Sequence, residues 1–350
     1  MFNWNALRRA SHSIGMPLVV CAGFFLIGCQ RTNPDCRNEV DVSTVQVNLK
    51  IQRLEQEMFQ LKSKEAIRAF LKNYPEFNQR FLKNNRAVND SMVVLALEQM
   101  TSNLFLDTLY KDVQKVYTDN EITQLEKELA DAFRHIKYYY PSFKIPKVYT
   151  AITGLGSFFG NDLYVSQDMI VISLDFFLGK QARYRPPDMP QYIWRRYQKS
   201  YIVPTIALYI SGAYNKTDMK DETILAEMIY YGKAYEFVKA AIPCVPDSVV
   251  LGYTQEQMQN LNDAKNKKFI WAHFVEKKLL YGNSKVIKGY TEERPYVAEM
   301  GPKVPGKIGC WLGWQIIQRY RKNTNNSSLQ DLMSNDKAAE IFKISAYRGD

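Results

Sequence analysis

The chain has 350 residues, of which 46% are hydrophobic and 13% aromatic, and its formal net charge is +10. This composition supplies a sizeable hydrophobic core for one large domain or two. Lys and Arg are scattered along the chain rather than clustered, so the positive charge is typical of a solvated surface and argues against nucleic acid as a partner.

The first 28 residues predict a lipoprotein signal peptide. Arg8 and Arg9 precede an apolar stretch of 15 residues, from 14 to 28, whereas a helix that spans a bilayer needs about 20. Its end resembles the bacterial lipoprotein signal, in which an aliphatic residue and two small or apolar residues precede a cysteine. These positions are Leu26, Ile27, Gly28 and Cys29. The resemblance implies that Cys29 becomes the first mature residue and carries acyl chains that hold the protein on a membrane. An uncleaved anchor is the alternative.

Three other cysteines remain in the mature chain, namely Cys36, Cys244 and Cys310. An odd number allows at most one disulfide within a chain. A bond between Cys244 and Cys310 is one expectation for an oxidising compartment, and buried free thiols are the other. Because no C-x-x-C pair is present, we expect these cysteines to bind no metal.

Residues 46–140 predict an all-helical region, which follows a polar tether at residues 29–45. Apolar residues recur at the helical period from Val47 onward, and Asp119 is a suitable N-cap for the last helix of the region. The expected helices cover residues 47–61, 66–73, 77–83, 91–117 and 121–139.

The pattern changes at Pro141, where β-branched residues bounded by Pro and Gly predict strands. The expected strands cover residues 146–152, 162–165 and 169–174. Helices then return over residues 190–211, 221–241, 254–281, 306–322 and 328–343. Thr254 and Gln257 have the spacing of a capping box. The chain therefore predicts an α+β fold, mainly helical, with a small central sheet, and residues 141–350 form its second region.

Motifs for common enzyme chemistry are missing from the sequence. His12, His135 and His273 form no His-Glu-x-x-His pair, which a zinc protease helix requires, and there is no G-x-S-x-G nucleophile turn. Neighbouring acids such as Glu292 and Glu293 are typical of a solvated surface. These observations predict a protein without catalytic residues, metal or other cofactor.

The order of elements nevertheless resembles the gluzincin-type metalloproteases, in which an edge strand precedes the His-Glu-x-x-His helix and a later helix supplies a glutamate. In this sequence, Thr205, Ile206 and Tyr209 stand where the His, Glu and His of the first helix would be. Tyr231 stands where the later helix would supply its glutamate. None of these side chains holds zinc as imidazole or carboxylate does. The resemblance implies a degenerate zincin-like architecture and a pseudoenzyme, whereas an ordinary helical core is the alternative.

Small and aromatic residues in two later helices define a candidate cleft. Its residues are Gly232, Lys233, Trp311 and Trp314. Gly309 and Gly313 are one turn apart, which lets another backbone approach closely, so tight core packing is one interpretation and a cleft wall is the other. We expect Lys233 to pair with Glu236, because a buried charge is unfavourable without a partner.

Eight short segments follow the lipoprotein signal in a characteristic order. They are DLYV (162–165), LDFFLG (174–179), YIVP (201–204), MIYYGK (228–233), GYT (252–254), PGKIG (305–309), WLGWQI (311–316) and SAY (345–347). Together they resemble the gliding-motility lipoproteins of the GldB family, from the phylum Bacteroidota, over nearly the whole mature chain. The resemblance implies an envelope lipoprotein linked to gliding and the associated secretion machinery. We expect it to act without catalysis, through contacts with other envelope proteins.

The sequence after Cys29 bears on localisation. In that phylum an acidic run at this place marks export to the cell surface, and none follows here, so we expect an anchor in the periplasm-facing leaflet of the outer membrane. A periplasmic hydrolase with an unrecognised site and a lipoprotein that binds glycan or peptide both remain open. Titratable groups that converge in a pocket would favour the hydrolase, and aromatic side chains in a groove would favour the glycan- or peptide-binding lipoprotein. An exposed apolar patch would favour a protein that binds other proteins.

Overall fold

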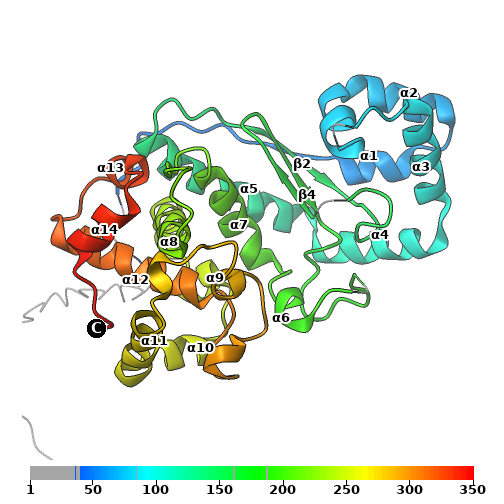
Figure 1. Cartoon of the computed structure of the whole chain (residues 1–350). Coiled ribbons are helices and arrows are strands. Elements are labelled where there is room, and N and C mark those ends of the chain that lie inside the picture. Colours follow the sequence, from blue (N-terminus) through cyan, green and yellow to red (C-terminus); the bar gives the residue numbers. More distant parts are fainter. Residues whose placement is uncertain (1–35, 37–39, 85, 161, 187) are drawn as a thin grey trace, which may run out of the picture. The chain divides into compact units, whose positions relative to one another are not determined.

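The computed structural model shows an α+β fold that is mainly helical and contains one small sheet, which confirms the predicted fold class (Figure 1). The signal peptide, its lipobox and Cys29 lie outside the described residues. All described residues belong to the compact unit Pro34–Asp350. They are residue 36 and residues 40–84, 86–160, 162–186 and 188–350. Within them, no helix has the length and apolar character to span a membrane.

The sheet has four strands in the order β1-β2-β4-β3. The strands are β1 (Ile51–Arg53), β2 (Lys147–Ala151), β3 (Leu163–Val165) and β4 (Met169–Ser173). Strands β1, β2 and β4 are parallel, and β3 is antiparallel to β4. All of β4 and most of β2 is buried, which agrees with their β-branched composition. The three predicted strands are confirmed.

Strand β1 contradicts the prediction that residues 46–140 are all helical. It pairs in register with β2, with Ile51 opposite Val148, and α1 begins directly after it at Leu54. Three residues are too few to show the two-residue period of a strand, and the helical period of α1 continues into them. Pairing with β2, which lies almost a hundred residues further along the chain, decides the conformation.

The helices before the sheet follow the predicted apolar pattern with one break. They are α1 (Leu54–Gln60), α2 (Lys64–Asn73), a π-helical segment (Phe77–Leu82), α3 (Asp90–Ser102), α4 (Leu104–Val116) and α5 (Asp119–Tyr139). The expected single helix over 91–117 is interrupted at Asn103, whose Oδ1 accepts from the backbone N–H groups of Phe105 and Leu106 and caps α4. The N-cap of α5 is Thr118 rather than Asp119.

The helices after the sheet are shorter and more numerous than predicted. They are α6 (Gln191–Trp194), α7 (Lys199–Ser211), α8 (Ile224–Ala241), α9 (Asp247–Leu251), α10 (Gln255–Asn262), α11 (Ala264–Glu276), α12 (Ile308–Asn323), α13 (Leu329–Ser334) and α14 (Ala338–Ser345), with 3₁₀ turns at Leu279–Tyr281, Lys288–Tyr290 and Ala298–Met300. The expected helix over 190–211 is divided because Gln198 has an extended backbone. The capping box at Thr254 and Gln257 is confirmed.

Helix α8 is the central helix of this part of the fold. It packs against α5, α7, α12, α13 and α14, and it is buried on almost every side (Figure 1). Its closest approach is to α12, where a Cβ added to Gly232 would lie 2.6 Å from the carbonyl oxygen of Gly313. The two glycines therefore let two backbones meet directly, as the glycine spacing in α12 indicated.

The cysteines form one disulfide, but not the expected pair. Cys244, just after α8, is bonded to Cys36, and Cys310 is a buried free thiol. The predicted pairing of Cys244 with Cys310 is therefore wrong. Cys310 lies in the first turn of α12, where burial raises the pKa of its thiol to about 12, so it stays protonated and unreactive. The disulfide joins the tether to the end of the central helix.

A fully buried carboxylate, Asp175, holds the turn that follows β2. Its Oδ2 accepts from the backbone N–H groups of Thr153 and Leu155, at 3.2 and 2.7 Å, whereas Oδ1 has no hydrogen-bond partner. Burial raises the pKa of Asp175 to about 6, and the backbone hydrogen bonds only partly oppose this. The charged form is therefore unfavourable in the folded protein.

We expect Asp175→Asn to alter how stability depends on pH. The folded-state pKa lies about two pH units above the ordinary value of 3.8, so the folded state binds the proton more tightly than the unfolded state. The contribution of Asp175 to the free energy of unfolding is then highest below pH 3.8 and falls by roughly 3 kcal/mol as the pH rises to 6. Urea unfolding of both chains at several pH values measures this difference, and a constant difference would contradict the assignment.

Candidate functional site

Two of the predicted zincin positions lie on the wall of one cavity. This cavity has a volume of about 310 Å³, and Thr205 and Tyr209 of α7 line it, with the Tyr209 side chain 60% exposed at its mouth. Ile206 points into the hydrophobic core instead, and the described residues that line the cavity do not include Tyr231. The ring of Tyr231 packs against Tyr230 and Tyr235 on α8. Its hydroxyl is near enough to Glu293, on the cavity wall, for that charge to help burial raise the pKa of Tyr231. The zincin-like architecture stays a prediction.

One part of the cavity wall is a cluster of charges. Arg196 donates to both carboxylate oxygens of Glu293 at 2.8 and 2.9 Å, and Lys307 Nζ lies 2.9 Å from Glu293 Oε1. Burial acts to raise the pKa of Glu293, but the hydrogen bond and charge of Arg196, together with Lys307, outweigh it and lower the pKa to about 2. Two cations share one carboxylate, so the cluster carries a net charge of about +1.

A second polar cluster in the same wall has the opposite charge. The Tyr197 hydroxyl donates to Asp162 Oδ2 at 2.6 Å, and the backbone N–H of Leu163 donates to Oδ1 at 2.8 Å. Burial first, and then the Asp162 charge, raise the pKa of Tyr197, so its hydroxyl stays protonated. Within the described part of the chain, Asp162 forms no ion pair. Among the described residues, no cation therefore balances the carboxylate of this cluster.

Backbone geometry brings these groups together. Arg196 and Tyr197 are consecutive residues in the turn between α6 and α7, and their side chains reach different clusters. Gly252, in a left-handed conformation, passes close to Arg196: an added Cβ would lie 2.6 Å from Arg196 Cδ. The Tyr253 hydroxyl donates to the carbonyl of Gly306 at 2.8 Å, which fixes the segment that carries Lys307. Side chains from distant segments therefore meet in one place.

The charged residues of this cavity were not predicted from the sequence. Glu293 is exposed, as expected of a surface acid, but it also accepts from Arg196 and pairs with Lys307. The segments DLYV, YIVP, GYT and PGKIG each place one residue on the cavity wall, namely Asp162, Tyr201, Gly252 and Lys307. These segments, together with Thr205 and Tyr209 of the zincin-like pattern, were the sequence signals that pointed to the site.

Glu293 and the tyrosines of the cavity are held in fixed charge states. At neutral pH, Glu293 is a carboxylate and Tyr197 a neutral phenol, and burial also raises the pKa of Tyr201 and Tyr209. His135 and His273 lie elsewhere, against the backbone carbonyl of Asp131 and the hydroxyl of Tyr290. No group of three or more His, Cys, Asp or Glu that could bind a metal is found in the described ranges. The arrangement suits binding rather than proton transfer.

The predicted cleft residues lie in a packed interface. Gly232, Lys233, Trp311 and Trp314 are all buried between α8 and its neighbours, and none of them lines this cavity. Lys233 Nζ donates to the carbonyl oxygens of Lys216 and Asn335, at 2.5 and 2.7 Å. The predicted ion pair of Lys233 with Glu236 is therefore wrong, because two backbone carbonyls accept from the Lys233 ammonium instead of the Glu236 carboxylate. Burial lowers the pKa of Lys233 to about 8.

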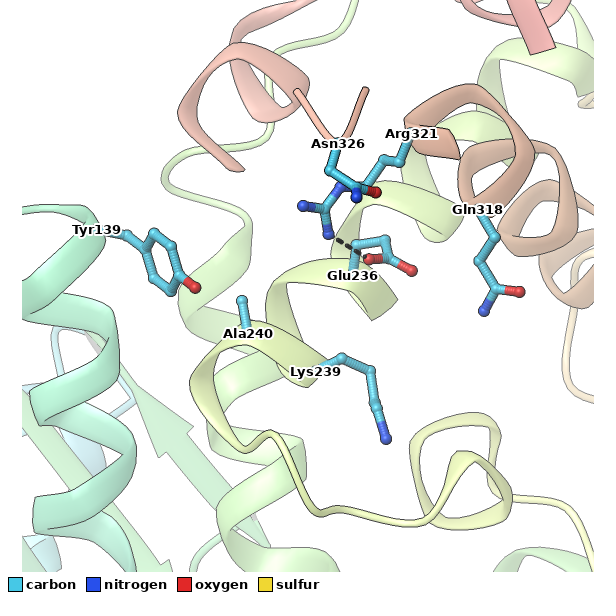
Figure 2. Close-up of a pocket in the computed structure, with 7 residues that line it drawn as sticks. All are labelled: Tyr139, Glu236, Lys239, Ala240, Gln318, Arg321 and Asn326. Atoms are coloured by element: carbon cyan, nitrogen blue, oxygen red, sulfur yellow. Dashed lines mark hydrogen bonds and ion pairs between the residues drawn. The ribbon is translucent and has the colours of Figure 1, made fainter. Parts of the chain in front are cut away.

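Glu236 belongs to a second, smaller cavity of about 210 Å³ between α8 and α12. It accepts from the Trp314 indole N–H at 2.8 Å and from Arg321 Nη1 at 2.9 Å. Figure 2 shows the Arg321 side chain meeting Glu236, with Lys239 and Tyr139 on other sides of the space. The charges of Glu236 and Arg321 neutralise one another. We therefore expect this cavity to bind a charged ligand less strongly than the 310 Å³ cavity does.

Comparison with known proteins identifies the family. No curated protein and no solved structure matches the chain. The sequence does match the family described as gliding motility protein GldB, over residues 35–349, which is nearly the whole of the described structure. This agrees with the segment order and with the lipoprotein signal. The chain therefore belongs to the GldB family of gliding-motility lipoproteins.

Proposed function

We propose that this protein is a non-catalytic lipoprotein of the cell envelope that acts through contacts with other proteins of a motility- or secretion-linked assembly. Family membership supports a role in gliding motility and in the envelope. Acyl chains on Cys29 anchor the protein, and it faces the periplasm from the outer membrane. The fold descends from a metalloprotease-like ancestor whose metal ligands have been replaced, so the protein is a pseudoenzyme.

The observation that carries this proposal is a set of apolar side chains exposed on two successive helices. We call it the α3–α4 surface, and it consists of Met92, Leu95, Leu104 and Phe105. Leu104 is 84% exposed and Met92 65%, although both lie in regular helices that pack on the core. Met92 and Leu95 are one turn apart on α3, and Leu104 and Phe105 begin α4, so this apolar surface is carried by rigid helices, as in many protein–protein interaction sites.

The disulfide supports an exported location. Disulfides persist in oxidising compartments such as the periplasm and are rare in the cytosol. Cys36 lies seven residues after Cys29 and is bonded to Cys244 at the end of α8. A fully extended chain covers about 3.3–3.6 Å per residue, so this tether reaches at most roughly 25 Å from the acylated cysteine. The bond therefore keeps the end of α8 near the membrane.

We expect a photo-crosslinking amino acid at position 104 to capture other envelope proteins in living cells. The Leu104 side chain is 84% exposed, so the replacement leaves the core intact. Mass spectrometry should identify components of the motility or secretion machinery among the captured proteins. Position 50 is the matched control, because the Lys50 side chain is 81% exposed but lies outside the α3–α4 surface. Equal capture at both positions, or capture of no envelope protein at position 104, would contradict the proposal.

We expect Cys29→Ala to abolish acylation and to release the protein from membranes. One acyl chain gives marginal binding and two or more give stable anchoring, so loss of the acceptor cysteine removes the anchor. Metabolic labelling with a fatty acid, followed by membrane fractionation, measures both effects. Cys36→Ser is the matched control, since it removes a nearby cysteine and its disulfide but keeps the lipobox. Persistent labelling of the Cys29→Ala chain would show that the lipoprotein assignment is incorrect.

A further inference from the structure

The larger cavity contains two opposite charges that are not paired with each other. The cluster of Arg196, Glu293 and Lys307 has one cation more than it has carboxylates, whereas Asp162 has a carboxylate and, within the described residues, no cation. An excess cation and a carboxylate without an ion pair each lose hydration in a cavity, and in the described residues no opposite charge fully replaces that hydration. A ligand that carries both charges would satisfy the two clusters together.

The donors and acceptors left over in the clusters define the chemistry of that ligand. The Lys307 ammonium has three N–H groups, and within the described residues its nitrogen forms one ion pair, with Glu293. Its side chain is 17% exposed and lines the cavity, so its remaining donors are within reach of a ligand bound there. A ligand carboxylate fits this cluster. Asp162 accepts one hydrogen bond at each oxygen and has further lone pairs, so a ligand ammonium fits beside it.

The size and the wall of the cavity limit the ligand further. A volume of about 310 Å³ lies at the lower end of the range typical of small-molecule sites. Between the polar groups the wall is apolar and aromatic, with Phe177, Ile193, Leu208 and Tyr201 among the lining residues. A neutral sugar would leave both charges unpaired. A peptide of two or three residues supplies the two terminal charges and apolar side chains.

We propose that this cavity binds a short peptide as a zwitterion, with the peptide's terminal carboxylate at Lys307 and Arg196 and its terminal ammonium at Asp162. Tyr209, 60% exposed at the mouth, covers the bound peptide with its ring. This inference goes beyond the proposed function, because the cavity shares no residue with the α3–α4 surface. Failure of peptide binding would therefore leave the cross-linking result unaffected.

The test uses the full chain in detergent and alanyl-phenylalanine as the probe. Isothermal titration calorimetry compares the free dipeptide with its N-acetyl and C-amide derivatives, each of which lacks one terminal charge. We expect the free dipeptide to bind and each derivative to bind at least tenfold more weakly. Because the protein is unmodified in this comparison, the result does not depend on whether a variant folds.

Two variants assign each end of the peptide. Asp162→Asn should weaken binding of the free and C-amide peptides at least tenfold but leave the N-acetyl peptide unchanged. Lys307→Gln should weaken binding of the free and N-acetyl peptides but not the C-amide. Lys285→Gln, which alters an exposed ion pair with Glu222 outside the cavity, is the control. Equal affinity for free and capped peptides would overturn the proposal, as would binding of neutral sugars without any binding of the dipeptide.

Discussion

Replacing Gly313 with alanine is expected to lower the free energy of unfolding by about 3 kcal/mol or more, or to prevent folding. A Cβ at this position would lie well inside van der Waals contact with the carbonyl oxygen of Met228 on α8. The obstacle is the backbone of a buried helix, which cannot move aside as a flexible side chain can. Overpacking of a core typically costs 1–3 kcal/mol and sometimes more.

Whether Gly313→Ala raises or lowers the free energy of unfolding distinguishes the effect of packing from that of helix propensity. Alanine is favoured over glycine within a helix by up to about 1 kcal/mol, so propensity alone predicts that Gly313→Ala is stabilising. Gly160→Ala is the matched control, because Gly160 is exposed and an added Cβ there has nothing within 4 Å. Urea unfolding of the three chains measures the difference. A Gly313→Ala chain as stable as the unmodified protein would show that α8 and α12 are not in direct contact.

Local patterns predicted those parts of the fold that depend on nearby residues. Helices α5, α8 and α12 each contain several turns of recurring apolar residues, and the strands β2 and β4 are runs rich in β-branched residues, of which β2 follows Pro146. The glycines of α12 correctly indicated close approach of another backbone. In each case the signal extends over enough residues for its period to be recognised.

The elements that were missed depend on residues distant in the sequence. Strand β1 has three residues and forms only because β2 lies beside it. The break at Asn103 depends on one side chain that caps α4 where the apolar pattern continues unchanged. Cys36 lies in a polar tether, so nothing near it indicates that it reaches Cys244. Tertiary contacts override local preference at all three places.

The candidate site was the least predictable feature for the same reason. Asp162, Arg196, Glu293 and Lys307 come from four separate segments, and no spacing rule relates them. Thr205 and Tyr209 were predicted from the sequence, and they do line the cavity. They were predicted because the order of elements resembles that of a metal site, and not because of the charges that define the cavity. A charged residue in a single sequence does not reveal whether it is solvated or paired across the fold.

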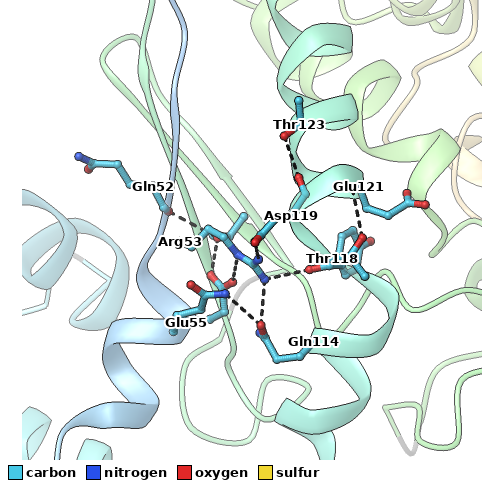
Figure 3. A network of polar contacts seen from close by, with 11 residues as sticks. Gln52, Arg53, Glu55, Gln114, Thr118, Asp119, Glu121 and Thr123 are labelled. Carbon is cyan, nitrogen blue, oxygen red and sulfur yellow. Dashed lines mark hydrogen bonds and ion pairs between the residues drawn. The ribbon is translucent and has the colours of Figure 1, made fainter.

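Removing the Arg53 guanidinium is expected to have the second large effect on stability. Arg53 donates to Glu55 and Asp119, both at 2.8 Å, and to the backbone carbonyl of Tyr117 at 2.9 Å, so it joins β1 to the end of α4 and the start of α5 (Figure 3). Glu55 is fully buried, and its other carboxylate oxygen accepts from the hydroxyl of Thr150 on β2. The guanidinium is therefore the cation that balances a carboxylate inside the protein.

We expect Arg53→Met to lower the free energy of unfolding by about 3–5 kcal/mol, because the Glu55 carboxylate is left buried without a cation. Methionine keeps much of the apolar stem, so lost packing contributes little. Adding Glu55→Gln to the same chain should recover part of the stability, since the uncompensated charge is removed, and the two single changes should not be additive. Urea unfolding of the two single variants and the double variant measures the free energies of this double-mutant cycle.

An exposed ion pair supplies the control for this experiment. Lys111 and Asp107 are one turn apart on α4, and their side chains are 66% and 47% exposed. Lys111→Met should therefore change stability by less than about 0.5 kcal/mol. If Arg53→Met has an equally small effect, then solvent must reach Glu55 in the folded protein, and the contact of β1 with α4 and α5 must be looser than the hydrogen bonds of Arg53 indicate. A large effect that Glu55→Gln partly reverses would show that this buried charge balance holds the N-terminal strand on the sheet.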